Sequence, residues 1–176
     1  NSIDGVLDCD LAAYCPIDST LNVDLSALSA VCSLDGKNMV LFTNETFHQI
    51  ASKLRFKDRE RNMIDHISAD FMAKNYQIEI LPFRLDMDRY SFIVGGQHSM
   101  DMSFNYHIDV LKSPIPFNFG LDVNGKVGDF KYNLGKTRYT ILFNRPIQHE
   151  EYRMSKQRRL DEEKVEILRE FRNVIP

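Results

Sequence analysis

The chain contains 176 residues, of which 43% are hydrophobic and 27% charged, and its formal net charge is -3 at pH 7. The apolar content excludes a disordered chain, the few glycines and prolines exclude a collagen-like one, and no apolar run approaches the roughly 18 residues of a membrane span. What remains is a soluble globular domain that buries about 70% of its unfolded surface and needs neither a metal nor a disulfide to fold.

The charge is distributed unevenly along the chain. Residues 1–50 hold six aspartates and one glutamate against a single lysine, which leaves a net charge of -6 there and +3 in the remainder. This distribution lacks the strong positive field of a nucleic-acid-binding protein. We therefore do not expect nucleic acid to be the main partner.

The first twenty residues show no sustained hydrophobic period, so we expect an irregular N-terminal arm over residues 1–20. They also lack the basic and apolar regions of a signal peptide, which indicates a processed product or an excised segment. Cys9, Cys15 and Cys32 fit neither a zinc-binding nor a redox motif. A bridge between Cys9 and Cys15 and three free thiols both stay open, and so does the cellular compartment.

Two apolar runs flank Asp35 and Gly36. An Asp-Gly pair between such runs is typical of a two-residue hairpin turn, because that turn requires a positive φ at both central residues. We therefore predict a hairpin within residues 27–43. A short helix over residues 24–34 that stops at Gly36 is the alternative.

Two helical segments are predicted next, over residues 44–56 and 64–74, and the first either breaks near Phe56 or continues along a charged, solvent-facing stretch. Their apolar side chains recur at the spacing of one helix face. These side chains are Phe47, Ile50, Ala51 and Leu54 in the first helix, and Ile64, Ile67, Phe71 and Met72 in the second. On the second helix His66 and Asp70 would form a solvated pair four residues apart.

The hydrophobic period changes to two between residues 76 and 143, which predicts an antiparallel meander of about five to seven strands. The clearest strand covers residues 100–110, where apolar and polar side chains alternate without interruption. A last strand is expected over residues 139–143.

One aromatic face of this sheet is the predicted core. Asn124-Gly125 is the strongest hairpin signal in the chain, and a two-residue loop there sets Phe119 opposite Phe130. We expect helices to pack on this aromatic face of a curved sheet. An apolar pocket under the sheet is the alternative.

Residues 148–173 contain no glycine or proline and are rich in helix-forming residues. They predict a long charged helix whose amphipathic second half packs and whose first half projects or meets a partner. The expected organisation is therefore an irregular arm over residues 1–20, one α+β domain over residues 21–146 and a C-terminal helix over residues 147–176.

The polar side of the clearest strand supplies the candidate ligand site. His107 and Asp109 share a face, so together they can hold a divalent metal, or Asp109 can orient His107 as a general base. His98 is the one nearby third ligand, and a metal site depends on it. A solvent-facing polar row is the alternative, because alternation alone predicts it.

The densest basic patch lies in the C-terminal helix. It consists of Tyr152, Arg153, Lys156, Arg158 and Arg159. Acidic residues on both sides cancel its field beyond about 10 Å. We therefore expect these residues to dock a protein partner or a second copy of the chain rather than nucleic acid.

No catalytic, phosphate-binding or cofactor motif of high specificity appears, so we expect no cofactor and favour a non-enzymatic role. The leading hypothesis is a protein-interaction or assembly module that docks its partner through the C-terminal helix or a sheet edge. A small-ligand-binding protein or minor enzyme with a site on or under the curved sheet is the alternative. Weak nucleic-acid binding through the basic part of the helix is the second alternative.

Overall fold

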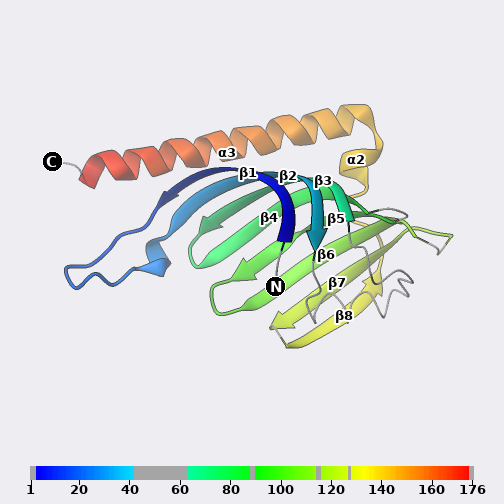
Figure 1. Cartoon of the computed structure of the whole chain (residues 1–176), viewed down its shortest axis with the longest axis horizontal. Coiled ribbons are helices and arrows are strands. Elements are labelled where there is room, and N and C mark those ends of the chain that lie inside the picture. Colours follow the sequence, from blue (N-terminus) through cyan, green and yellow to red (C-terminus); the bar gives the residue numbers. More distant parts are fainter. Residues whose placement is uncertain (1–2, 42–62, 88–89, 114–115, 127, 175–176) are drawn as a thin grey trace.

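The computed structural model describes residues 3–41, 63–87, 90–113, 116–126 and 128–174. Within them, eight antiparallel strands form one open sheet in sequence order, with a long helix on one side (Figure 1). The predicted α+β meander is thus confirmed, with eight strands rather than five to seven. The elements are β1 (Ile3–Tyr14), the 3-10 helix η1 (Leu25–Ala27), β2 (Ser29–Leu41), β3 (Met63–Lys74), β4 (Gln77–Met87), β5 (Tyr90–Ser99), β6 (Ser103–Lys112), β7 (Phe119–Lys126), β8 (Asp129–Gly135), α2 (Ile141–Asn144) and α3 (Pro146–Val174).

The irregular arm expected over residues 1–20 is largely a strand. Leu7, Cys9 and Leu11 alternate with aspartates, which is the period of a half-covered strand. β1 pairs with β2 along its whole length, so a partner distant in sequence stabilises a segment whose local signal is weak.

The hairpin predicted within residues 27–43 is wrong, because β2 continues through Asp35 and Gly36. Gly36 pairs with β1 on one side and β3 on the other. Ladder hydrogen bonds to two strands outweigh the local preference of an Asp-Gly pair for a turn. The alternative helix over residues 24–34 is also wrong, since only the three residues of η1 are helical there.

The helix predicted over residues 64–74 is strand β3, while the helix predicted over residues 44–56 lies outside the described residues. β3 contributes apolar side chains to both faces of the sheet, with Phe71 on one and Met72 on the other. A strand covered on both faces loses its simple alternation, and its apolar residues can then imitate a helical spacing.

The alternating segment predicted over residues 100–110 is confirmed as β6, although Met100 and Met102 lie in the turn that precedes it. In β4 the register shifts between Ile80 and Phe83, which places Pro82 at an irregularity of the ladder. A proline fits there because it has no N–H to donate.

The β7–β8 hairpin keeps the predicted faces but not the predicted register. Its last pair is Lys126 with Asp129, so Gly125 lies within β7 and faces Phe130. Compared with the predicted register, in which Phe119 faces Phe130, β8 is shifted along β7 by six residues. Because six is even, both phenylalanines stay on the face that the alternation assigned to them.

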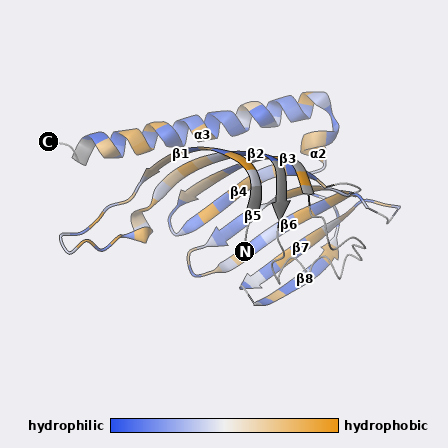
Figure 2. Cartoon of the chain, in the orientation of Figure 1, coloured by the Kyte–Doolittle hydropathy of each residue, from blue (hydrophilic) through white to orange (hydrophobic). Residues whose placement is uncertain are grey.

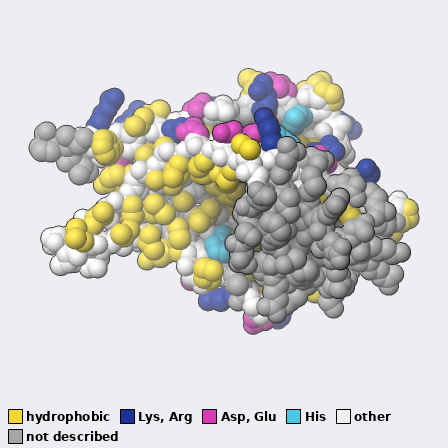
Figure 3. Space-filling view, viewed as in Figure 1, with side chains coloured by type: hydrophobic (Ala, Val, Ile, Leu, Met, Phe, Trp, Pro, Cys, Tyr) yellow, Lys and Arg dark blue, Asp and Glu magenta, His cyan; other side chains and the backbone are white. Residues whose placement is uncertain are grey.

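The two faces of the sheet differ in chemistry, since paired residues on adjacent strands share a face. One row across all eight strands, the aromatic face, is Leu11, Cys32, Phe71, Ile80, Gly96, Tyr106, Val123 and Tyr132. The matching row on the other face, the polar face, is Ala12, Val31, Met72, Glu79, Gln97, Asn105, Asn124 and Lys131. Figure 2 shows the alternation along the strands, and Figure 3 shows a broad hydrophobic patch below α3.

Of the described helices, α3 packs on the polar face and not on the aromatic face as expected. Its buried Leu160 and Ile167 meet Val31 and Leu81, which lie on the first four strands. The first half of α3 does not project, because the hydroxyl of Tyr152 donates a hydrogen bond to the carbonyl of Pro82 on β4 (2.6 Å). The strand predicted over residues 139–143 is replaced by the short helix α2. No helix in the described part of the chain is long and apolar enough to cross a membrane.

Two leucines of α3 provide a direct test of how the helix is oriented. Leu160 is 3% exposed and Leu168 is 56% exposed. We expect Leu160→Ala to lower the free energy of unfolding by about 2–3 kcal/mol, because it leaves a cavity between helix and sheet. Leu168→Ala is the matched control and should change it by less than about 0.5 kcal/mol. Urea denaturation measures both, and equal losses would contradict this orientation.

Candidate functional site

Two glycines open the polar face of the sheet to the loop that precedes α2. Gly95 and Gly120 lie on the strands on either side of β6. A Cβ atom at Gly120 would lie 2.2 Å from the carbonyl oxygen of Lys136, and one at Gly95 would lie 3.1 Å from the ring of Tyr139. Glycine at both positions therefore lets the loop of residues 136–140 rest directly on the strands.

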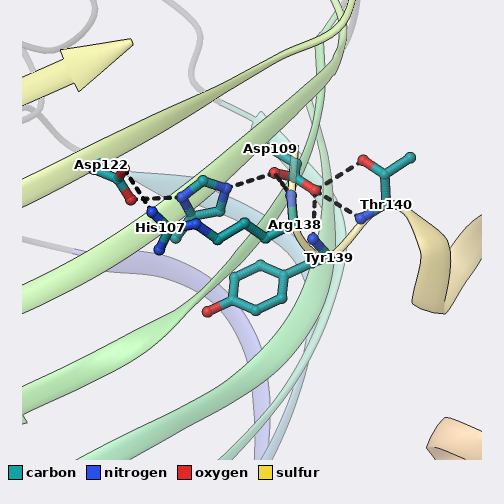
Figure 4. A network of polar contacts seen from close by, with 6 residues as sticks. All are labelled: His107, Asp109, Asp122, Arg138, Tyr139 and Thr140. Carbon is teal, nitrogen blue, oxygen red and sulfur yellow. Dashed lines mark hydrogen bonds and ion pairs between the residues drawn. The ribbon is translucent and has the colours of Figure 1, made fainter. Parts of the chain in front are cut away.

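Asp109 on β6 is the centre of the site, and its side chain is 0% exposed. One carboxylate oxygen accepts a hydrogen bond from the backbone N–H of Arg138 (2.9 Å) and lies 2.8 Å from Nε2 of His107. The other accepts hydrogen bonds from the backbone N–H groups of Tyr139 and Thr140 (2.7 Å each) and from the Thr140 hydroxyl (2.8 Å) (Figure 4). A buried carboxylate is tolerated only when it is satisfied in this way, so Asp109 fixes the loop on the sheet.

His107 is held between two carboxylates. Its Nε2 faces Asp109, and its Nδ1 lies 2.7 Å from Oδ1 of Asp122 on β7. The ring is 3% exposed and meets the ring of Tyr139 edge-on, with 5.4 Å between the ring centroids. Both ring nitrogens are engaged, so neither is left to take a proton from a ligand. His107 thus acts as a positioning residue that links the two acidic groups.

A cleft of about 360 Å³ lies over this network, with polar lining from β4, β5, β6 and the loop. The polar residues that line it are Glu79, Gln97, Asn105, His107, Arg138 and Tyr139. The guanidinium of Arg138 donates to Asp122 (2.8 Å), yet its side chain remains 58% exposed. Burial raises the pKa of the Tyr139 phenol, which keeps its hydroxyl neutral.

The structure brings together two of the three predicted ligands. His107 and Asp109 lie side by side and both are buried, so the solvent-facing polar row expected as the alternative is wrong for these two residues, whereas Asn105 of the same row is exposed. His98 lies on the aromatic face, where its Nδ1 is 2.9 Å from the hydroxyl of Tyr106. The third ligand on which a metal site depends is therefore absent from this cluster. Across the described residues, no group of three His, Cys, Asp or Glu side chains is placed to hold a metal.

Most of the predicted docking residues of α3 are taken up within the chain. Tyr152 bonds to β4, and burial raises its pKa. Lys156 lies 2.6 Å from Asp70, and Arg159 lies 2.7 Å from Glu79. Arg153 pairs with Glu150 on the same helix, and Arg158 is exposed. Three of the five residues, Tyr152, Lys156 and Arg159, therefore hold α3 on the sheet.

Sequence reasoning missed Asp122 and Arg138. Asp122 stands two residues before the predicted Asn124-Gly125 turn, where no local pattern marks it, and nothing local marks Arg138. The available signal was glycine inside predicted strand segments, at Gly95 and Gly120, because glycine in a strand often marks a close backbone approach.

The chemistry of the assembled site suits binding more than catalysis. Arg138, Gln97 and Asn105 offer hydrogen-bond donors at the cleft. Both ring nitrogens of His107 already contact carboxylates within the protein. In comparisons with known proteins, no family model, no curated protein and no solved structure matches this chain.

Proposed function

We propose that this protein binds a small polar ligand that carries one carboxylate group, in the cleft beside Arg138. The observation that carries the proposal is that the Arg138 guanidinium is held in place and is also accessible to a ligand. Asp122 holds its guanidinium in place through one contact, and more than half of the side chain stays accessible at the cleft. A guanidinium fixed in this way can still form paired hydrogen bonds with a carboxylate.

The charges around the cleft favour a carboxylate over a phosphate. Glu79 lines the cleft, although it is paired with Arg159, and Asp122 lies beside Arg138. A doubly charged phosphate would meet stronger repulsion from these two acidic groups than a singly charged carboxylate.

The amides of the polar face favour a ligand that also bears hydroxyl groups. Gln97 and Asn105 are cross-strand neighbours, and Asn124 continues the row on β7. Side-chain amides both donate and accept hydrogen bonds, which matches the hydroxyl groups of a sugar acid. The alternative of partner docking through α3 has fewer residues left to support it, because its basic side chains pair within the chain.

Glucuronate is a suitable probe, with glucose as the uncharged comparison. We expect glucuronate to shift the backbone NMR signals of Gln97, Asn105 and Arg138 with a millimolar dissociation constant. Arg138→Gln should weaken this binding about tenfold or more, because a charge-assisted hydrogen bond is lost. Arg158→Gln removes an exposed arginine of α3 outside the cleft and should leave binding unchanged.

Three results would contradict the proposal. One is the absence of shifts at these residues with glucuronate. Another is equal binding of glucose, which would show that Arg138 recognises no charge. The third is tighter binding of inorganic phosphate. Thermal melting of both variants would show that the fold is retained.

A further inference from the structure

Two of the three cysteines lie side by side on the aromatic face. Cys9 on β1 pairs with Leu34, and Cys32 on β2 pairs with Leu11, so the two thiols are diagonal neighbours on one face. Their sulfur atoms are 3.6 Å apart. We propose that Cys9 and Cys32 form a reversible disulfide that clamps the edge strand β1 to β2.

Cys15 does not belong to this pair. Between Cys9 and Tyr14 the chain is extended in β1, a separation of about 17 Å, whereas the Cα atoms of a disulfide lie within about 7 Å. The Cys15 thiol donates instead to the carbonyl of Asp24 (3.4 Å). The bridge between Cys9 and Cys15 that the sequence left open is therefore excluded.

The geometry permits the bond with a small movement. A disulfide requires the sulfur atoms to approach by about 1.5 Å from their present separation. β1 is an edge strand bonded to one neighbour, so it can adjust without disturbing a second ladder. Besides its hydrogen bonds to β2, β1 forms an ion pair on the polar face between Asp10 and Lys164 of α3 (2.7 Å).

The oxidant that fits this site is a small disulfide such as oxidised glutathione. The exposed Cys9 thiolate attacks one of its sulfur atoms, which forms a mixed disulfide and releases one glutathione thiol. Cys32 then loses its proton and attacks the sulfur of Cys9, which releases the second glutathione and closes the bridge. Two protein thiols are thereby oxidised, and one disulfide is reduced to two thiols.

The two cysteines have different roles in this sequence. Burial, followed by the hydrogen bond with Cys9, raises the pKa of the Cys32 thiol to about 11. Cys32 is therefore protonated at neutral pH, so the exposed Cys9 is the thiol that reacts first, and the closing step at Cys32 should become faster as the pH rises and more of its thiolate forms. Closing the bridge lowers the conformational entropy of the unfolded chain, which stabilises the folded state. It should also stabilise β1 against local opening.

The test uses the full chain incubated with oxidised glutathione and then mapped by non-reducing peptide mass spectrometry. We expect a peptide that links Cys9 to Cys32, with Cys15 still open to alkylation. Tm should rise by about 5–10 °C relative to the reduced protein, and dithiothreitol should reverse the change.

Two variants separate the steps. Cys15→Ser should retain both the linked peptide and the rise in Tm, while Cys32→Ser should stop at a glutathione adduct on Cys9. A linked peptide that contains Cys15, a persistent adduct on Cys9 of the unaltered chain, or an unchanged Tm would overturn the proposal. None of these results depends on whether the cleft at Arg138 binds a carboxylate.

Discussion

Asp109→Asn is expected to lower the free energy of unfolding by about 4 kcal/mol, with the loop of residues 136–140 released from the sheet. The buried carboxylate accepts four hydrogen bonds from that loop and contacts His107. Asparagine removes the charge and turns an NH₂ group toward donors, so several N–H groups are left unsatisfied in a buried place. Urea denaturation would give the loss, and hydrogen exchange at Tyr139 and Thr140 would show the release of the loop.

The control for this prediction is Asp129→Asn, an exposed aspartate at the start of β8. It makes the same chemical change and should leave the stability within about 0.5 kcal/mol of the original. A loss below about 1 kcal/mol in Asp109→Asn would show that water or a neighbouring group replaces the missing interactions. Asp109 could then no longer be regarded as the anchor of the site.

The strand signals in the sequence were reliable where one face is apolar and the other polar. β6 alternates without interruption, and its predicted faces agree with the structure, although the strand begins at Ser103 and not at Met100. The predictions for β2 and β3 failed for different reasons. At β2, pairing with two neighbouring strands outweighs the local turn signal, and at β3 apolar side chains lie on both faces and imitate a helical spacing. The Asp-Gly and Asn-Gly pairs predict turns, yet both lie within strands. A local turn preference contributes little free energy compared with hydrogen bonds to a strand on each side.

The site could be predicted only in part. Alternation places His107 and Asp109 on one face, and this part is confirmed. The meeting of His107 with Asp122 depends on the β6–β7 register, which a connection with Pro114 and Pro116 does not determine from local turn chemistry. The burial of the pair depends on the loop of residues 136–140, which lies over the strands instead of continuing into a further strand.

A methyl group at Gly120 should be almost as damaging as the loss of the Asp109 carboxylate. In Gly120→Ala the new Cβ atom would lie 2.2 Å from the carbonyl oxygen of Lys136 and 2.8 Å from Cε1 of His107. Both neighbours are held in place, one by the loop backbone and the other by two carboxylates, so the loop must lift off the sheet. We expect a loss of about 3 kcal/mol in urea denaturation, because overpacking is here combined with weakened hydrogen bonds to Asp109.

Gly135→Ala is the matched control, because Gly135 is the residue that faces Gly120 across the β7–β8 ladder. A Cβ atom at Gly135 meets nothing within 4 Å, so the same added methyl group should leave stability within about 0.5 kcal/mol. The double variant Gly120→Ala with Asp109→Asn then gives a sharper result. If both changes act by releasing the same loop, the double variant should lose clearly less free energy of unfolding than the two single variants lose together. Full additivity would mean that Gly120 and Asp109 stabilise separate parts of the molecule, and the polar face would then hold no single assembled site.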